Sequence, residues 1–109
     1  MQQDLTCSNN SDSDGNPAGG EVRGTGISIE WQDGPLGRDE DRLAPNGAFV
    51  EGVIQAALQR IEYYQEARDR RFACRENALA ITKLQEALHW CQHRTAAREL
   101  RGVEGTHNA

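Results

Sequence analysis

The chain has 109 residues, a formal net charge of −5 and only 37% hydrophobic residues. Such a length holds one small domain at most. No apolar run approaches the roughly 18–20 residues that span a bilayer, so we expect no membrane-spanning segment. The N-terminus lacks a basic stretch followed by an apolar core, so no secretory signal is expected either.

The cysteines and the net charge exclude further classes of protein. Cys7, Cys74 and Cys91 are an odd number without CxxC spacing. This argues against a disulfide framework or a zinc ribbon and favours the reduced thiols of a cytosol. The acidic balance disfavours non-specific binding to DNA. It leaves room for a local basic site, so a small RNA or DNA binder is kept as a minor alternative.

Residues 1–24 are rich in Ser, Asn, Asp and Gly, and they contain no aromatic residue. A segment with so little apolar surface cannot offset its ordering entropy, so we predict a disordered acidic tail there and a folded domain over 25–109. Residues 26–32 (GISIEWQ) alternate apolar and polar side chains, which predicts a half-buried strand. A turn rich in Gly and Pro follows, and a short return strand or an irregular loop would occupy 36–44.

Two amphipathic helices are expected after this ribbon. Pro45-Asn46-Gly47 is a helix-start signal with Asn46 as the candidate N-cap. The first helix would run to about residue 68, and the second would end at Gly102. The expected core-facing rows are Val50, Ile54, Ala57, Ile61 and Tyr64 in the first helix and Asn77, Ile81, Leu84, Leu88, Cys91, Thr95 and Arg98 in the second.

The predicted fold class is therefore mostly α, an antiparallel two-helix hairpin preceded by a short β ribbon. Each helix buries one row, which leaves Phe49, Tyr63, Phe72 and Trp90 without cover. So few ordered residues form a marginal core for a monomer, so we predict a homo-oligomer in which hairpins pack on hairpins. The alternative is a monomer whose ribbon covers the remaining face.

Arginine dominates the basic residues, and residues 68–101 carry a net charge of +4 inside an acidic chain. At the hairpin tip Phe72, Arg75 and Asn77 combine an aromatic face, a guanidinium and an amide, which together suit a nucleotide. A solvated helix end explains the same charges without a ligand, and Asn77 could equally fix the register of a buried seam. A second basic focus lies before the small polar turn GVEGT and consists of Arg94, Arg98 and Arg101.

Catalytic and metal-binding patterns are absent from the sequence. His89 and His93 share a helix face while Cys91 points elsewhere, so packing and surface roles suit these residues better than a zinc site. There is no GxSxG motif and no P-loop, and no Cys–His pair has the spacing of an activated nucleophile. We therefore expect no enzyme activity, no cofactor and no metal.

Three stretches resemble the phage helical-hairpin family of nucleotide sponges, which includes the anti-CBASS and the Thoeris anti-defence sponges. They are NGAFVEGVI (46–54), FACRENALAITKLQEALHW (72–90) and RTAARELRGVEGTH (94–107). The ribbon GISIEWQDGPLG (26–37) is more similar to the Thoeris-type members, which carry an N-terminal β element. The resemblance covers about residues 26–107 and leaves 1–24 outside it.

The resemblance implies a protein that binds, without cleaving, the cyclic nucleotide messengers of bacterial immunity and so keeps their effector off. Thoeris-type members take up a cyclic ADP-ribose isomer made by TIR-domain proteins. Related members take up cyclic dinucleotides and, in a separate pocket, cyclic trinucleotides. The resemblance further implies homohexamers with pockets between neighbouring protomers, acting in the cytoplasm of the infected host, with neither long nucleic acid nor a membrane as partner.

Transferred by matching motif, the resemblance implies two ligand sites. In the main pocket Phe72 would stack on adenine, Asn77 would bond the base or ribose, and Arg75 would pair with phosphate. Tyr64 is the alternative stacking residue. In the second site the 101–106 turn would meet phosphate oxygens, with arginines adding charge. The full set of expected ligand residues is Phe72, Arg75, Asn77, Tyr64, Arg94, Arg98, Arg101, Gly105 and Thr106.

The competing interpretation is a phage structural or protein-interaction hairpin with no small-molecule ligand. In that case the apolar rows are assembly surface and the arginines face solvent. Replacing Arg75 and Asn77 by alanine separates the two, because only a sponge would lose ligand uptake while its oligomer size stays unchanged.

Overall fold

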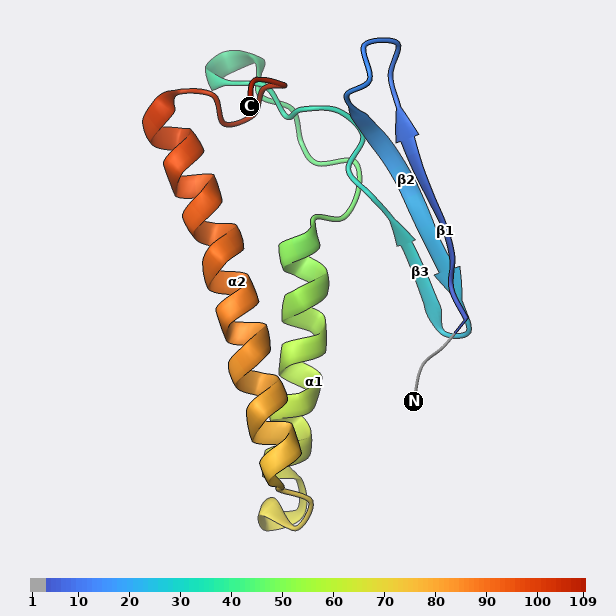
Figure 1. Cartoon of the computed structure of the whole chain (residues 1–109), viewed down its shortest axis with the longest axis vertical. Helices are drawn as coiled ribbons and strands as arrows, with labels where there is room; N and C mark the ends of the chain where they lie inside the picture. The colour runs from blue at the N-terminus through green and yellow to red at the C-terminus, as the bar shows by residue number, and fades with distance from the viewer. Residues whose placement is uncertain (1–3) are drawn as a thin grey trace. The chain divides into compact units, whose positions relative to one another are not determined.

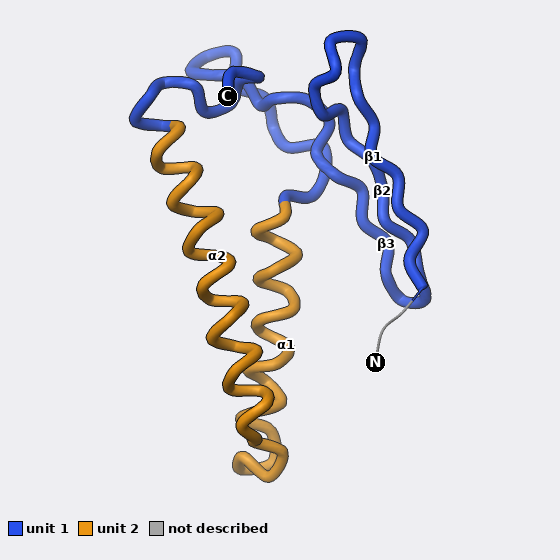
Figure 2. The backbone as a smooth tube through the Cα atoms, in the orientation of Figure 1, with its two compact units in different colours: residues 1–49, 99–109 blue, residues 50–98 orange. Residues whose placement is uncertain are grey.

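The computed structural model describes residues 4–109 of the chain. Two compact units divide it, one over 1–49 with 99–109 and the other over 50–98 (Figure 2). The β-sheet belongs to the first unit and the body of the helical hairpin to the second. The elements are β1 (Thr6–Ser11), β2 (Pro17–Gly24), β3 (Ile27–Glu30), the short 3-10 helix η1 (Asp39–Asp41), α1 (Val50–Arg70) and α2 (Arg75–Arg101) (Figure 1).

The three strands form one antiparallel sheet in the order β1-β2-β3 (Figure 1). The predicted strand over 26–32 is confirmed as β3, although it is shorter. Its partner is β2, with Val22 opposite Ile29, and not the 36–44 segment that follows it. That segment is an irregular loop containing η1, which was one of the two alternatives open from the sequence.

The disordered tail predicted over 1–24 differs from the structure, which has β1 and β2 in this region, with residues 1–3 outside the described part. Every residue of β1 is exposed, so burial of side chains contributes little to this hairpin. Local hydrogen bonds stabilise it instead. In the connecting turn Asp12 Oδ1 accepts the backbone N–H groups of Asp14 and Asn16, each at 2.9 Å. These bonds, the one from Asn16 most, lower the pKa of the Asp12 carboxyl. The prediction of disorder considered only how little apolar surface these residues could bury. Hydrogen bonds within a turn do not depend on that surface, so the prediction did not anticipate this hairpin.

Asn46 is not the N-cap of α1, which begins at Val50. Its side chain is instead bonded to the loop after β3, where Oδ1 accepts the Asp33 N–H at 2.8 Å and Nδ2 donates to the Asp33 carbonyl at 3.0 Å. The chain then forms an isolated parallel bridge between Trp31 and Ala48. The residue expected to start the helix thus fastens the chain to the end of the sheet.

The C-terminal turn is bonded to the loop that contains η1, within the same unit. The Gly37 N–H donates to the Gly105 carbonyl at 2.9 Å. Arg42 forms a two-pronged pair with Glu104, with N···O distances of 2.6 and 2.9 Å. Hydrogen bonding to Glu104 is the main reason that the pKa of the Arg42 guanidinium is raised. The turn therefore has a defined conformation although little of it is buried.

The helices α1 and α2 run antiparallel and are joined by a short turn (Figure 1), so the predicted hairpin is confirmed. Every member of the row predicted for α2, from Asn77 to Arg98, is half-buried. This is the pattern expected where one face of a helix packs against a neighbour. Among the described residues no helix combines the length and apolarity needed to cross a membrane.

The row predicted for α1 is partly wrong. Ile54 and Ile61 are half-buried as expected, but the most buried positions of the helix are Leu58 and Gln65, each 9% exposed. Ile54, Leu58, Ile61 and Gln65 are separated by four, three and four residues and therefore lie on one face of the helix. This face is rotated about the helix axis from the predicted one. A polar residue such as Gln65 gives no hydropathy signal, and the apolar pattern points to its neighbour instead. The predicted members that are exposed are Val50, Ala57 and Tyr64.

Little of the chain is buried. Over residues 4–109 no side chain is fully enclosed, and Leu58 is the buried apolar one. Monomeric proteins rarely leave large apolar patches in contact with water. The exposed large apolar side chains include Leu43, Phe49, Val50, Tyr63, Tyr64, Phe72, Leu79, Trp90 and Leu100.

Candidate functional site

The tip of the helical hairpin carries four of the residues that the sequence assigns to a ligand site. Tyr64 lies near the end of α1, Phe72 lies in the connecting turn, and Arg75 and Asn77 open α2. All four belong to the second unit. Phe72 and Tyr64 are 54% and 43% exposed, so both rings are accessible from solvent.

The turn at the tip has an unusual backbone. α1 loses helical geometry at Ala67, whose ψ is 141°, close to the predicted helix end. The next three residues, Arg68, Asp69 and Arg70, have positive φ values of 51°, 52° and 68°. Left-handed geometry costs a residue with a Cβ about 1–2 kcal/mol. Such strain persists only where surrounding contacts hold it, and it is common at ligand-binding segments.

Arginine side chains lie against the aromatic rings of the tip. The Arg60 guanidinium lies 5.0 Å from the ring centroids of both Tyr63 and Tyr64, and its Nε donates to the Tyr64 hydroxyl at 3.2 Å. The Arg71 guanidinium lies 5.9 Å from the Phe72 centroid. Because Tyr64 is engaged at both its ring and its hydroxyl, Phe72 is the more available of the two stacking candidates.

The side chains of Arg75 and Asn77 make no hydrogen bond or ion pair with the rest of residues 4–109. The backbone N–H of Asn77 donates to Cys74 Sγ at 3.4 Å, so Cys74 acts as the N-cap of α2. Arg70, by contrast, pairs with Glu66 at 2.7 Å. The tip therefore carries an exposed guanidinium without a partner, the unpaired amide of the half-buried Asn77 and, in the preceding turn, an exposed aromatic ring.

The second predicted site falls in the turn that closes α2. Arg101 is exposed, and Gly105 has a φ of 79°, where a Cβ would overlap the Gly37 carbonyl. The Thr106 hydroxyl donates to the Val103 carbonyl at 2.5 Å. The hydroxyl proton of Thr106 is thus already donated inside the turn. A phosphate could accept this proton only if the hydrogen bond to Val103 were broken.

Arg94 and Arg98, which were expected to add charge to this second site, belong to the other unit. Arg94 is exposed on α2, and Arg98 is half-buried at the end of the buried row. Of the second set, Arg101, Gly105 and Thr106 lie in one unit. Its role as a ligand site stays a prediction.

Two concavities open in the sheet unit. The larger, of about 470 Å³, includes the carboxylates of Glu21, Glu30 and Asp33 in its lining. The smaller, of about 330 Å³, shares Trp31 with it. None of the expected ligand residues lines either concavity. Carboxylates repel phosphate, so the larger one is ill suited to an anionic messenger.

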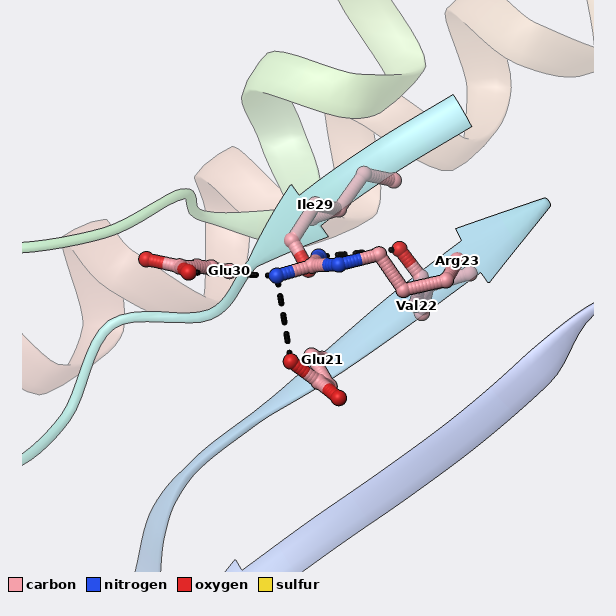
Figure 3. Close-up of polar contacts among 5 residues, drawn as sticks. All are labelled: Glu21, Val22, Arg23, Ile29 and Glu30. Atoms are coloured by element: carbon pink, nitrogen blue, oxygen red, sulfur yellow. Dashed lines mark hydrogen bonds and ion pairs between the residues drawn. The ribbon is translucent and has the colours of Figure 1, made fainter. Parts of the chain in front are cut away.

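Arg23 joins two of these carboxylates across the sheet (Figure 3). Its guanidinium lies 3.0 Å from Glu21 and 3.1 Å from Glu30, and it donates to the Ile29 carbonyl at 2.8 Å. Both prongs of the guanidinium are therefore used between β2 and β3. Arg23 is a structural residue of the sheet and is not available to a ligand.

The imidazoles of α2 form a ring cluster with Trp90. His89 and His93 stack with centroids 6.3 Å apart, and the Trp90 ring meets them edge-on at 5.4 and 5.7 Å. In the part of the chain that the structure describes, no three His, Cys, Asp or Glu side chains are grouped so as to hold a metal ion.

Two residues of the tip were missed from the sequence, Gln65 and Arg60. Gln65 bonds both backbone groups of Cys74, and Arg60 covers the tyrosine pair. The available signal for Gln65 is its 3-4 spacing from the buried row, which places a polar side chain on the inner face. The signal for Arg60 is its i, i+4 relation to Tyr64, which puts the two on one face of the helix.

The fold and the tip define a small protein in which an antiparallel sheet precedes a helical hairpin with a basic, aromatic end. The profile of the family described as Acb2/Tad1, hairpin domain, matches residues 25–96. The chain belongs to this family, which confirms the resemblance found in the sequence.

The chain is also similar to a protein named Thoeris anti-defense 1 from Bacillus phage SBSphiJ7, with 46% identity over 80 residues. The match covers 73% of this chain and 51% of the relative, so the chain spans about half the length of the curated relative that it matches. The family match contains the whole hairpin tip and ends at residue 96, before Arg98 and the 101–106 turn.

Proposed function

We propose that this is a phage anti-defence protein that binds a cyclic nucleotide messenger of a bacterial immune system and sequesters it without cleaving it. The name of the relative, Thoeris anti-defense 1, supports the anti-defence role and the Thoeris system as its target. The favoured messenger is a cyclic ADP-ribose isomer made by TIR-domain proteins. Cyclic di- and trinucleotides are further candidates.

The chemistry of the hairpin tip carries this proposal. Arg75 and Asn77 have unpaired side chains at the start of α2, and the exposed Phe72 lies in the turn just before it. An aromatic face stacks on a base, a guanidinium pairs with phosphate oxygens, and an amide bonds a base or ribose edge. Phe72 takes the stacking role in preference to Tyr64, which Arg60 already engages. No side chain is assigned a catalytic role.

A second copy of the chain is proposed to complete the site. The tip is open surface on one chain, and Leu79 and Trp90 are 46% and 64% exposed on α2. Covering such side chains favours association of hairpins. The assembly is therefore proposed as a homo-oligomer, a hexamer by family resemblance, in which a neighbouring hairpin supplies the opposite wall.

A second anion site is proposed at the 101–106 turn. Its backbone around Gly105 and the Thr106 hydroxyl would meet phosphate oxygens, and the charge would come from arginines. Thr106 would exchange its bond to Val103 for one to the ligand. The sequence assigns Arg94, Arg98 and Arg101 to this site, and Arg101 is the one that lies in the same unit as the turn.

Sequestration requires affinity and no turnover. A nanomolar dissociation constant corresponds to about −12 kcal/mol. Charge-assisted hydrogen bonds contribute about 1.5–3 kcal/mol each, and stacking on an aromatic ring contributes about 1–3 kcal/mol per base. Three such bonds at the upper end of their range, together with stacking, reach about 12 kcal/mol when the cleft is formed in advance and little freedom is lost on binding.

Calorimetry with the cyclic ADP-ribose isomer tests the proposal. Replacing Arg75 and Asn77 together by alanine should weaken binding by about 100-fold or more, since two contacts to the ligand are lost. The subunit number should not change. Arg70→Ala is the matched control, because it removes a tip arginine that is already paired with Glu66. A double variant that binds like the wild type, or a wild type that gives no heat with any cyclic nucleotide, would contradict the proposal.

A structural hairpin is the second candidate, favoured by the large apolar side chains that are exposed on both helices. It predicts an assembly without any ligand. A small molecule retained by protein purified from infected or defence-expressing cells would exclude a purely structural hairpin, because a surface used only for assembly binds no nucleotide.

A further inference from the structure

Gln65 is a buried polar residue at the hairpin tip. It is 9% exposed, and its amide forms two hydrogen bonds with the backbone of Cys74, nine residues away. Oε1 accepts the Cys74 N–H at 2.9 Å, and Nε2 donates to the Cys74 carbonyl at 3.3 Å. The side chain thus pairs with both backbone groups of Cys74, as a neighbouring strand would. We call these two bonds the Gln65 bracket.

The Gln65 bracket spans the strained part of the turn. Arg68, Asp69 and Arg70, whose φ values are positive, lie between the two residues that it joins. A left-handed run of residues with Cβ atoms is unfavourable by itself and needs contacts outside the run to hold its ends. The two part-buried hydrogen bonds to Cys74 provide such a contact.

Cys74 in turn sets the start of α2. Its Sγ accepts the Asn77 N–H at 3.4 Å, and its carbonyl accepts the Ala78 N–H at 3.2 Å. α2 begins immediately after it, at Arg75. The positions of the Arg75 and Asn77 side chains therefore depend on where Cys74 is held.

We propose that Gln65 is a positioning residue for the ligand site at the tip, acting through Cys74 without touching the ligand itself. This rests on the proposed function of the tip. The side chains of Arg68 and Arg75 have no hydrogen-bond or ion-pair partner within residues 4–109, whereas the Arg70 side chain is paired with Glu66. One of these arginines lies within the bracketed turn and the other opens α2, so the position of each guanidinium depends on how the turn is held.

Gln65→Met tests the Gln65 bracket, because methionine keeps the length and packing of the side chain and removes both hydrogen bonds. With the TIR-made cyclic ADP-ribose isomer as the probe, the dissociation constant should rise about 10- to 100-fold. Hydrogen exchange at the Cys74 amide should accelerate, while helix content and subunit number stay unchanged. Gln59→Met is the matched control on the same helix, since Gln59 is exposed and bonds only within its own turn, at Ala56.

Gln65→Glu separates hydrogen bonding from packing. A neutral carboxylic acid can accept the Cys74 N–H and donate to the Cys74 carbonyl, whereas a carboxylate can only accept. Binding by this variant, measured against the wild type at the same pH, should recover as the pH falls and the carboxyl gains its proton. A role in packing alone predicts that Gln65→Met, which keeps the packing, binds like the wild type, so the two variants together separate the roles.

The outcomes are distinguishable. Unchanged affinity in Gln65→Met overturns the positioning role, whether or not Cys74 exchange has accelerated. A wild type that binds no cyclic nucleotide overturns the proposed function and the positioning role together. Loss of affinity with faster Cys74 exchange, and recovery of Gln65→Glu in acid, support the proposal.

Discussion

At the scale of single residues, polar side chains bonded to backbone groups define the turns of this molecule. Asp12 holds the β1–β2 turn, Asn46 holds the loop after β3, and Gln65 holds the hairpin tip. Each pairs with a segment that has little apolar surface of its own. Hydrogen bonding therefore gives these turns a defined shape that hydrophobic burial does not provide.

The Asp12 turn should loosen in acid. Hydrogen bonds from Asn16 and Asp14 lower the pKa of the Asp12 carboxyl below its ordinary value of 3.8. The folded turn thus favours the ionised form, and its contribution to stability is present above pH 3.8 and is lost as the pH falls through the lowered pKa. Protection of the Asp14 and Asn16 amides from hydrogen exchange should fall in that range. Asp12→Asn keeps one acceptor oxygen and cannot titrate, so an equally steep loss in this variant would contradict the assignment.

Gly105→Ala should destabilise the sheet unit by about 2 kcal/mol or more, measured by urea unfolding. Its φ is 79° and a new Cβ would overlap the Gly37 carbonyl, beside the hydrogen bond that the Gly37 N–H donates to the Gly105 carbonyl. Gly26→Ala is the control, because its φ is 75° but nothing lies within 4 Å. It should lose about 1 kcal/mol, the backbone penalty alone. Equal losses in the two variants would contradict the close contact.

At the scale of elements, the sequence predicts the helices well and the sheet poorly. The half-buried row of α2 has the predicted members because its 4-3 spacing is a property of helix geometry. β2 was not predicted because Val22 is its one bulky aliphatic residue and glycines occupy much of the strand. Gly20 is there because a Cβ would overlap the Ser8 carbonyl of β1. Glycine is needed in this strand because two backbones approach closely. The hydropathy pattern of the sequence carries no information about such an approach.

The candidate site likewise contains residues that the sequence predicts and one residue whose role it does not predict. Phe72, Arg75 and Asn77 could be chosen from the sequence because their chemistry is evident from residue type. Gln65 could not be assigned its role, because its function depends on reaching Cys74 across a turn of left-handed backbone. Non-glycine residues in that conformation carry no sequence signal.

Gly52→Ala should stabilise the hairpin by about 0.5–1 kcal/mol, because alanine is the better helix former and a Cβ at this position meets nothing within 4 Å. A higher thermal midpoint, with the subunit number unchanged, is the expected result. A lower midpoint would mean that Gly52 lies where another copy approaches closely.

At the scale of the whole molecule, the main feature is how little of it is buried. Leu58 and Gln65 are the buried side chains of residues 4–109, so most of the apolar surface is available for association. The proposed oligomer would cover part of it and would also complete the ligand site. Assembly and ligand binding are therefore coupled in this account.

Trp90→Glu should weaken assembly by roughly 30-fold or more, because buried aromatic anchors contribute about 2 kcal/mol or more at interfaces. Trp90 is 64% exposed on one chain, with His89 and His93 against its ring. Light scattering after size-exclusion chromatography gives the subunit number across a dilution series. Gln92→Glu adds the same charge at an exposed position of the same helix and should leave assembly intact. Unchanged assembly of Trp90→Glu would remove this face from the interface.

Native mass spectrometry of the protein purified from cells that express a TIR-domain defence system tests the central claim most directly. The account predicts an oligomer whose added mass is that of intact cyclic ADP-ribose isomer, and release of the same compound, unaltered, when the protein is denatured. A bare monomer, or release of a linear or hydrolysed product, would contradict it.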